Sequence, residues 1–252
     1  MEQKEALFNY LLRLGDNAAI LGHKLSEWCG HGPELEEDIA IINTALDLLG
    51  HARSLYTYAG QVEGKGRTED DIAYLRIERE YRNALICELP NGHYGDTIAR
   101  QFLFDQYNHL LFSELVKSKD ETIAAIASKA VKEISYHLRR STEWTLRLGD
   151  GTEESHARIQ DSFNDLWMYT GDLFVQDEAD AVVIAAGIGP DLQHIFPVWR
   201  EKVGSVLSQA TLKMPEDGWM QSGSKQGRHT EHMGFILAEL QYMQRAYPGC
   251  EW

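Results

Sequence analysis

Residues 98–116 read IARQFLFDQYNHLLFSELV, and this stretch decides the fold. Its apolar side chains recur in alternating steps of four and three residues, which places them on one face of an α-helix. Asp105 and His109 lie on the same face, inside the apolar seam. A buried carboxylate or imidazole without a partner costs roughly several kcal/mol. The sequence therefore predicts a polar partner for this pair elsewhere in the core.

The rest of the chain also carries helical patterns. Leucine-rich stripes predict a long helix over residues 5–28, which ends at Gly30-His31-Gly32-Pro33, and a second over 34–60. The second is apolar nearly all round, so we expect it to be central. Further stripes predict helices over residues 69–88, 95–117, 123–148, 153–173, 178–186, 191–210 and 229–246, with a polar loop at 215–228.

Long helices joined by short connections predict an all-α fold, a ferritin-like antiparallel helical bundle with a C-terminal helical arm. We expect residues 1–252 to form a single domain. In this interpretation residues 1–176 form the bundle core, and residues 177–252 form helices and an arm that pack on it.

The composition excludes several classes of protein. The formal net charge of −15, from 39 acidic and 24 basic residues, disfavours nonspecific binding to nucleic acid or to an anionic membrane. No run approaches the roughly 20 apolar residues of a membrane span, so we expect a cytoplasmic protein. Cys29, Cys87 and Cys250 are too far apart to indicate a disulfide framework or a zinc site.

Four acidic residues lie at matching depths in two predicted helical hairpins. Asp16 and Asp47 flank the first turn at nearly equal distances, and Asp105 and Glu133 flank the second. In ferritin-like bundles two helices each supply one Glu and two each supply Glu-x-x-His, all pointing inward to hold two irons. The matching depths therefore indicate a ferritin-like ancestry.

The ligand pattern itself is incomplete. Gly50 follows Asp47 by three residues and Tyr136 follows Glu133 by three, and neither residue is a usual iron ligand. Histidines occur one step later, which pairs each acid with a histidine on a shared helix face. These pairs are Asp47 with His51, Asp105 with His109, and Glu133 with His137.

Three interpretations of these residues stay open. Asp47, Asp105, His109, Glu133 and His137 form a degenerate metal site that is now a buried polar cluster, a working diiron site, or ordinary helix surface. The helical angle places Asp47 off the leucine seam of its helix, and Asp16 almost opposite its own. With Gly50 and Tyr136 at lost ligand positions, we favour the polar cluster and predict no metal in this chain.

A row of basic residues is the best candidate for contact with a ligand. Arg76, Arg79 and Arg82 recur every three residues beside Tyr81 and Asn83, and guanidinium groups suit the phosphates of a CoA or nucleotide moiety. The alternative is an Arg/Glu surface face. The HxxH motif His229–His232 fits a metal site or, as we favour, a polar first turn of the last helix.

The motifs also resemble a known family over essentially the whole chain. The C subunit of the bacterial phenylacetyl-CoA epoxidase is similar in the runs Leu14–Asn17, Ser26–Glu36, Leu46–Gly50, Pro90–Gly92, Lys132–Arg139 and His229–His232. That enzyme adds one oxygen atom from O2 across the aromatic ring of phenylacetyl-CoA during aerobic phenylacetate catabolism. The resemblance implies a ferritin-like monooxygenase complex.

The resemblance implies that this chain is the noncatalytic structural subunit. Its expected partner is a related catalytic subunit that holds the irons and, through it, the reductase and the other subunits. The chain itself would carry no cofactor and no catalytic residue. Two alternatives remain at this point, namely an autonomous diiron-carboxylate oxygenase or iron-handling bundle, and a helical protein that binds a small ligand.

Overall fold

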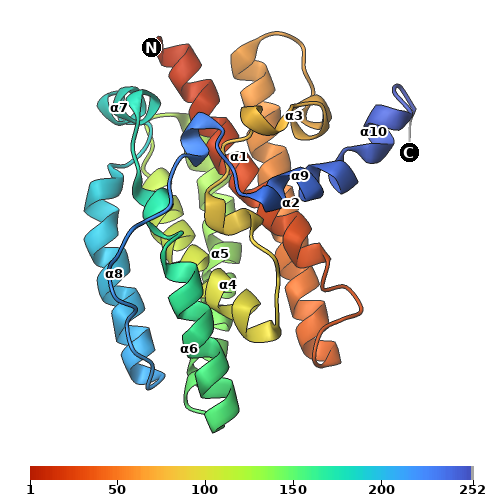
Figure 1. Ribbon diagram of the computed structural model, residues 1–252. Coiled ribbons are helices and arrows are strands. Elements are labelled where there is room, and N and C mark those ends of the chain that lie inside the picture. Colours follow the sequence, from red (N-terminus) through yellow and green to blue (C-terminus); the bar gives the residue numbers. More distant parts are fainter. Residues whose placement is uncertain (251–252) are drawn as a thin grey trace. The chain divides into compact units, whose positions relative to one another are not determined.

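The computed structural model describes residues 1–250, and within this range it is all-α, with no β-strand (Figure 1). The predicted fold class, an all-α helical bundle, is confirmed. Contacts between residues divide the chain into two compact units. The first unit contains Met1–Pro90, Asp177–Val182 and the described residues from Gly223 onward. The second contains Asn91–Gln176 and Val183–Ser222.

The first unit is built on a long antiparallel hairpin of α1 (Gln3–Ser26) and α2 (Leu35–Glu63) (Figure 1). The helix over residues 34–60 was expected to be central, but α1 is the more enclosed of the two. Leu11, Leu14 and Leu21 of α1 are buried, whereas Leu35 and Leu46 of α2 are exposed. An apolar helix surface therefore does not by itself place a helix at the centre of its unit.

The helix predicted over residues 69–88 is wrong. A Thr68–Asp71 capping box starts α3 (Glu69–Tyr74), and the chain then continues as short 3-10 turns, η1 (Glu78–Glu80) and η2 (Leu85–Glu88). The reason is Arg76, which turns inward: its Nε donates to the Ile72 carbonyl at 2.6 Å and its Nη1 to the Glu80 carbonyl at 2.9 Å. These bonds hold a non-helical loop in place.

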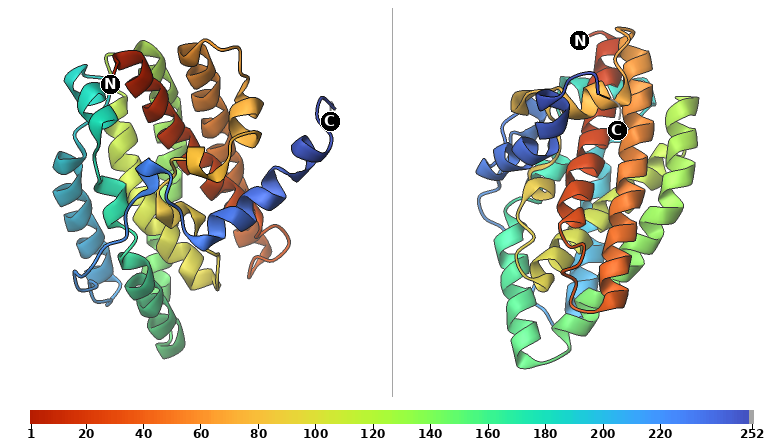
Figure 2. Two further views of the ribbon diagram at one scale, coloured as in Figure 1. Left: turned by 45° about the horizontal axis from the view of Figure 1, so that its top comes forward. Right: turned by 90° about the vertical axis from the view of Figure 1, so that its right-hand side faces the viewer.

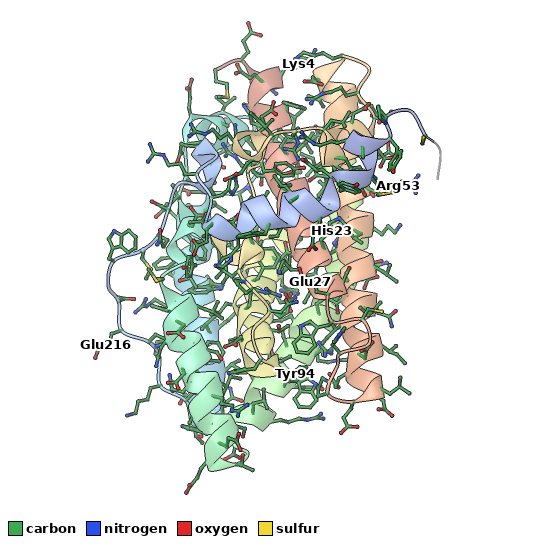
Figure 3. All side chains as sticks on the ribbon, turned by 45° about the vertical axis from the view of Figure 1, so that its right-hand side comes forward. Lys4, His23, Glu27, Arg53, Tyr94 and Glu216 are labelled. Atoms are coloured by element: carbon green, nitrogen blue, oxygen red, sulfur yellow. The ribbon has the colours of Figure 1, made fainter. Side chains whose placement is uncertain are left out.

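The C-terminal segment of the first unit packs against this loop. It contains η4 (Ser224–Gln226), α9 (Glu231–Leu240) and α10 (Tyr242–Ala246), and Figure 3 shows α9 lying across the direction of α1. One continuous helix over 229–246 was predicted, but it is interrupted at Gln241. The Gln241 amide donates to the Arg76 carbonyl at 2.7 Å and to the Tyr81 hydroxyl at 3.0 Å.

The second unit surrounds α4 (Tyr94–Leu115), the helix of the opening stretch. Helices α5 (Glu121–Gly149), α6 (Glu153–Trp167) and α8 (Leu192–Gln209) pack against α4 (Figure 2). The residues of α4 are buried continuously from Thr97 to Asn108. The Trp199 indole of α8 donates to the Leu103 carbonyl at 3.1 Å and stacks on Trp167 with ring centroids 5.6 Å apart. The prediction of a long helix at residues 95–117 is confirmed.

The helix predicted over 153–173 ends earlier, at Trp167, and is followed by η3 (Gly171–Phe174). The Thr170 hydroxyl donates to the Trp167 carbonyl at 2.8 Å, which closes the end of the helix. A Cβ on Gly171 would lie 2.8 Å from the Met220 Cβ, so the chain passes closely here. The short α7 (Glu178–Ala185) follows. Among residues 1–250, every helix is too short or too polar to cross a lipid bilayer.

Candidate functional site

The Asp16 carboxylate of α1 is a fully buried polar group of the first unit. Its Oδ1 accepts from the Tyr56 hydroxyl at 2.6 Å and from Arg76 Nη2. Its Oδ2 accepts from Arg76 Nη1 at 3.0 Å and from the Arg82 backbone N–H at 2.7 Å. A carboxylate offers about four lone-pair positions. All of the hydrogen-bonding capacity of Asp16 is therefore used by this chain.

Local sequence explains how these groups meet. A Cβ on Gly15 would lie 2.5 Å from Tyr56 Cε1, so glycine at this position lets the tyrosine ring lie against α1 and reach Asp16. The Arg76 guanidinium lies 4.1 Å from the centroid of the Tyr81 ring. Burial opposes the charge on Arg76, but Asp16 outweighs it and holds the pKa of Arg76 above its usual value. Burial, together with Asp16, raises the pKa of Tyr56.

The sequence interpretation of Asp16 was therefore wrong. The helical angle placed it almost opposite the leucine seam, yet its side chain is fully buried because α1 is enclosed on nearly all sides. From the sequence, Arg76 was a candidate contact for a ligand and not the partner of Asp16. Its contact with Asp16 joins residues far apart in the chain and has no local sequence pattern.

A second buried network holds the C-terminal segment. The His229 Nδ1 lies 2.8 Å from Glu88 Oε2, and its Nε2 lies 3.2 Å from the Tyr81 carbonyl oxygen. Glu88 also accepts from the Asn83 amide at 2.9 Å and from the Thr230 backbone N–H at 2.5 Å. Burial lowers the pKa of His229, but these acceptors outweigh it and the net pKa is raised. His229 thus precedes α9, Thr230 is the N-cap of this helix, and His232 lies in its first turn.

A third network joins the segment at 177–182 to α1. Arg13 forms an ion pair with Asp177 and lies 2.9 Å from Asp180, and Lys225 Nζ contacts Asp180 at 2.7 Å. Arg13, Asp180 and Lys225 all have largely buried side chains. The three networks together place paired charges throughout the interior of the first unit.

In the second unit, Asp105 of α4 is buried and bonded to side chains. It accepts from the Ser141 hydroxyl of α5 at 2.8 Å and from the Gln101 amide at 3.4 Å. Burial raises the pKa of Asp105 to about 7, although the Ser141 hydrogen bond and the charge of Arg140 oppose the rise. The predicted polar partner on another core helix therefore exists. Ser141 was missed, although it follows His137 by four residues and so shares its helix face.

The other residues of the predicted polar cluster differ in how far they are buried. His137 is buried, Glu133 is partly exposed, and Tyr136 is 43% exposed. His109 is half-buried, and burial and then the charge of Lys202 lower its pKa. These residues lie in the second unit, on α4, α5 and α8.

Asp47 and Gly50 lie on α2 of the first unit. Asp47 is partly exposed, Gly50 is exposed, and neighbouring His51 is buried. Within residues 1–250, no three His, Cys, Asp or Glu side chains come together in a way that could hold a metal ion. The matching depths of the acids along the sequence thus do not correspond to a metal-binding group in the described part of the chain.

The predicted row of basic residues does not form a helix face, because the segment is not helical. Arg76, Tyr81 and Asn83 are buried and bonded to groups of this chain, as described above. Arg82 is partly buried, with its Nη1 2.8 Å from the Tyr81 carbonyl, and Arg79 is exposed. Contact of this row with a CoA moiety stays a prediction. Arg79 and Arg82 are the residues of the row that remain accessible to solvent.

Comparison with known proteins gives consistent results. The chain is 46% identical over 243 residues to the C subunit of 1,2-phenylacetyl-CoA epoxidase from Escherichia coli (strain K12). The aligned region covers 96% of this chain and 98% of that protein. The chain is also 24% identical over 140 residues to the A subunit of the same enzyme from the same organism. This aligned region covers 56% of this chain and 44% of that protein. The model of the family described as phenylacetic acid catabolic protein matches residues 1–252. The resemblance seen in the sequence motifs is confirmed, and the chain belongs to the phenylacetic acid catabolic protein family.

Proposed function

We propose that this chain is a noncatalytic structural subunit of a multicomponent oxygenase that epoxidises the aromatic ring of phenylacetyl-CoA in phenylacetate catabolism. In this proposal it pairs with a catalytic partner chain, a relative of the A subunit of 1,2-phenylacetyl-CoA epoxidase, and stabilises it. The catalytic partner chain would hold the irons and connect this chain to the reductase and the other subunits. The similarity to the C subunit of that enzyme supports the assignment to the complex.

The state of Asp16 is the observation that supports a noncatalytic role. Iron in ferritin-like proteins is held by carboxylates that keep free lone pairs for the metal. Both oxygens of Asp16 instead accept hydrogen bonds from Tyr56, Arg76 and Arg82, and the Arg76 guanidinium supplies the positive charge. A metal at Asp16 would have to displace a buried cation.

The other candidate ligands fit two irons poorly. Asp105 is buried, and its carboxylate oxygens accept hydrogen bonds from Ser141 and Gln101 of this chain. Gly50 and Tyr136 are exposed and stand where a diiron pattern requires histidines. The donor set therefore supports a chain that keeps the fold of a diiron protein without its metal chemistry.

Coexpression with the catalytic partner chain tests the proposal. We expect the two chains to copurify at a fixed ratio, with iron in the catalytic partner chain and less than about a tenth of an equivalent in this chain purified alone. The iron content of an Arg76→Met variant is compared with that of the wild-type chain, because this substitution removes the cation from Asp16. Near-stoichiometric, tightly bound iron with a carboxylate-bridged spectrum in the wild-type chain alone would contradict the proposal and favour an autonomous diiron oxygenase.

A further inference from the structure

The outer side of α2 carries a row of exposed apolar side chains. Leu35, Ile39 and Leu46 are 71%, 51% and 60% exposed, and Ile42 between them is partly exposed. At 100° per residue all of them fall within one narrow stripe of the helix. Single exposed apolar residues are ordinary, but a contiguous row on one helix marks an interaction surface.

Gly50 continues the same stripe and is the second observation. It lies in the interior of a long helix, where glycine is one of the least favourable residues. A Cβ on Gly50 would have no atom of this chain within 4 Å, whereas Gly15, Gly60 and Gly149 are crowded by Tyr56, Arg67 and Ala210. Packing within this chain therefore gives no reason for glycine here. Close approach of another chain does, because a helix without a side chain lets a neighbouring backbone come near.

The stripe is long enough for a helix-to-helix contact. Leu35 and Gly50 are separated by about 22 Å at 1.5 Å per residue. Arg53, one turn further on, also belongs to the outer side of α2, and its side chain is 78% exposed. Figure 3 shows Arg53 projecting from α2. The surface thus changes from apolar to polar along the helix, as interfaces do from their core to their rim.

We propose that this outer face of α2, formed by Leu35, Ile39, Leu46 and Gly50, is the surface on which the catalytic partner chain docks. The inference rests on the proposed function and names the surface that the pairing uses. The partner presents an apolar helix that approaches most closely at Gly50.

Charge selects this occupant over a second copy of the chain. Glu34 and Glu36 are exposed beside the apolar stripe, and the whole chain has a formal net charge of −15. Two copies would each bring this net negative charge to the contact, and like charges across an interface disfavour association. The face therefore fits a different chain that places Lys or Arg beside its apolar helix.

A second apolar patch of the first unit provides a matched control. Phe235 of α9 is 72% exposed, close to the values for Leu35 and Leu46. Its sequence neighbour Gly234 lines a groove of about 590 Å³, together with Ile77, Leu237 and Tyr242 among others. The glycine of that groove, Gly234, would place a Cβ in ordinary contact with Glu78 Oε2 at 3.9 Å.

The test measures binding of full-length variants to the purified catalytic partner chain. Leu46→Glu and Gly50→Leu should each raise the Kd about tenfold or more, because they introduce a charge and bulk into the contact. Phe235→Glu should bind like the wild type. Each variant alone should keep the far-UV circular dichroism of the wild type, since the changed positions are exposed.

The outcomes separate the two proposals. If wild-type chain does not bind the catalytic partner chain, the proposed function fails and this inference fails with it. If wild type binds and both α2 variants bind equally well, the docking face is wrong while the proposed function stands. Loss of binding in Phe235→Glu alone would also overturn the α2 assignment and would place the contact on α9.

Discussion

At the scale of single residues, Asp105 shows how burial changes the chemistry of a carboxyl group. Its folded pKa of about 7 lies above the ordinary value of 3.8 because of burial, even though Ser141 donates a hydrogen bond to it. Well below its ordinary pKa, the carboxyl is neutral in both the folded and unfolded chains. Between about pH 4 and pH 7 the unfolded chain loses the proton first, so Asp105 lowers the free energy of unfolding as pH rises.

Asp105→Asn should therefore remove this loss of stability. We expect the variant to exceed the wild type in free energy of unfolding at pH 8, by at most about 4 kcal/mol, and to approach it near pH 4. Urea unfolding at pH 4.5, 6 and 8 measures the difference. Asp150→Asn, at an exposed aspartate, is the control and should change little at any pH. A difference that does not depend on pH would contradict the assigned titration.

Arg76→Met tests the ion pair with Asp16. The variant leaves a fully buried carboxylate without its counter-charge, so we expect a loss of about 3–5 kcal/mol in the free energy of unfolding. The double variant Asp16→Asn/Arg76→Met should recover part of this loss, because no lone charge remains. Arg79→Met changes an exposed arginine three residues away and should stay within about 0.5 kcal/mol of the wild type. Strictly additive effects of the two substitutions would show that the pair is not coupled.

At the scale of secondary-structure elements, His229 holds α9 through Glu88. The folded pKa of His229 is raised, so its stabilising contribution is complete below pH 6.5 and is lost as pH rises through the folded pKa. We expect the hydrogen-exchange protection factors of the α9 amides to fall over this range in the wild type. In His229→Gln these protection factors should already be low at pH 6 and should not change with pH.

His232→Gln is the control for that experiment, because its ring is partly exposed and it is not bonded to Glu88. It should keep the wild-type pH dependence. If His229→Gln and the wild type show the same pH profile, another group controls the attachment of α9.

Two glycines of the α1–α2 hairpin should respond oppositely to alanine. Gly50→Ala adds a methyl group that meets nothing, so the better helix propensity should stabilise the isolated chain by about 1 kcal/mol. Gly15→Ala places its methyl against the Tyr56 ring and should lower the free energy of unfolding and disturb the Asp16 network. Thermal unfolding of both variants measures this contrast. Equal and positive shifts would contradict the close contact at Gly15.

At the scale of the whole molecule, pairing with the catalytic partner chain should stabilise this chain by mass action. At a partner concentration of 100 times Kd, binding adds about 2.7 kcal/mol to the free energy of unfolding. We therefore expect Tm to rise with the concentration of the catalytic partner chain. Gly50→Leu should show a smaller rise at equal concentration. A Tm that stays constant while the two chains elute together would contradict a stabilising role.

Individual elements show where prediction from sequence succeeds. Residues 98–115 form a largely buried helix, as predicted, because the helical period is a property of the local sequence. Asp105 accepts a hydrogen bond from Ser141, as expected from the cost of leaving a buried polar group unpaired. The segment 69–88 failed for the opposite reason. Arg76 prefers buried Asp16 and nearby carbonyls over a helical conformation, and that preference depends on residues distant in the chain.

The sequence by itself determined the helical class, the positions of the long helices and the family. Periodicity and motifs are properties of the sequence and do not depend on the tertiary contacts. Only the tertiary structure decided which helix faces are buried and which cation neutralises which acid. It placed Asp16 with Arg76 and left Leu35, Leu46 and Gly50 of α2 facing outward. The physical reason is that burial and ion pairing depend on contacts between distant segments, which no local pattern specifies.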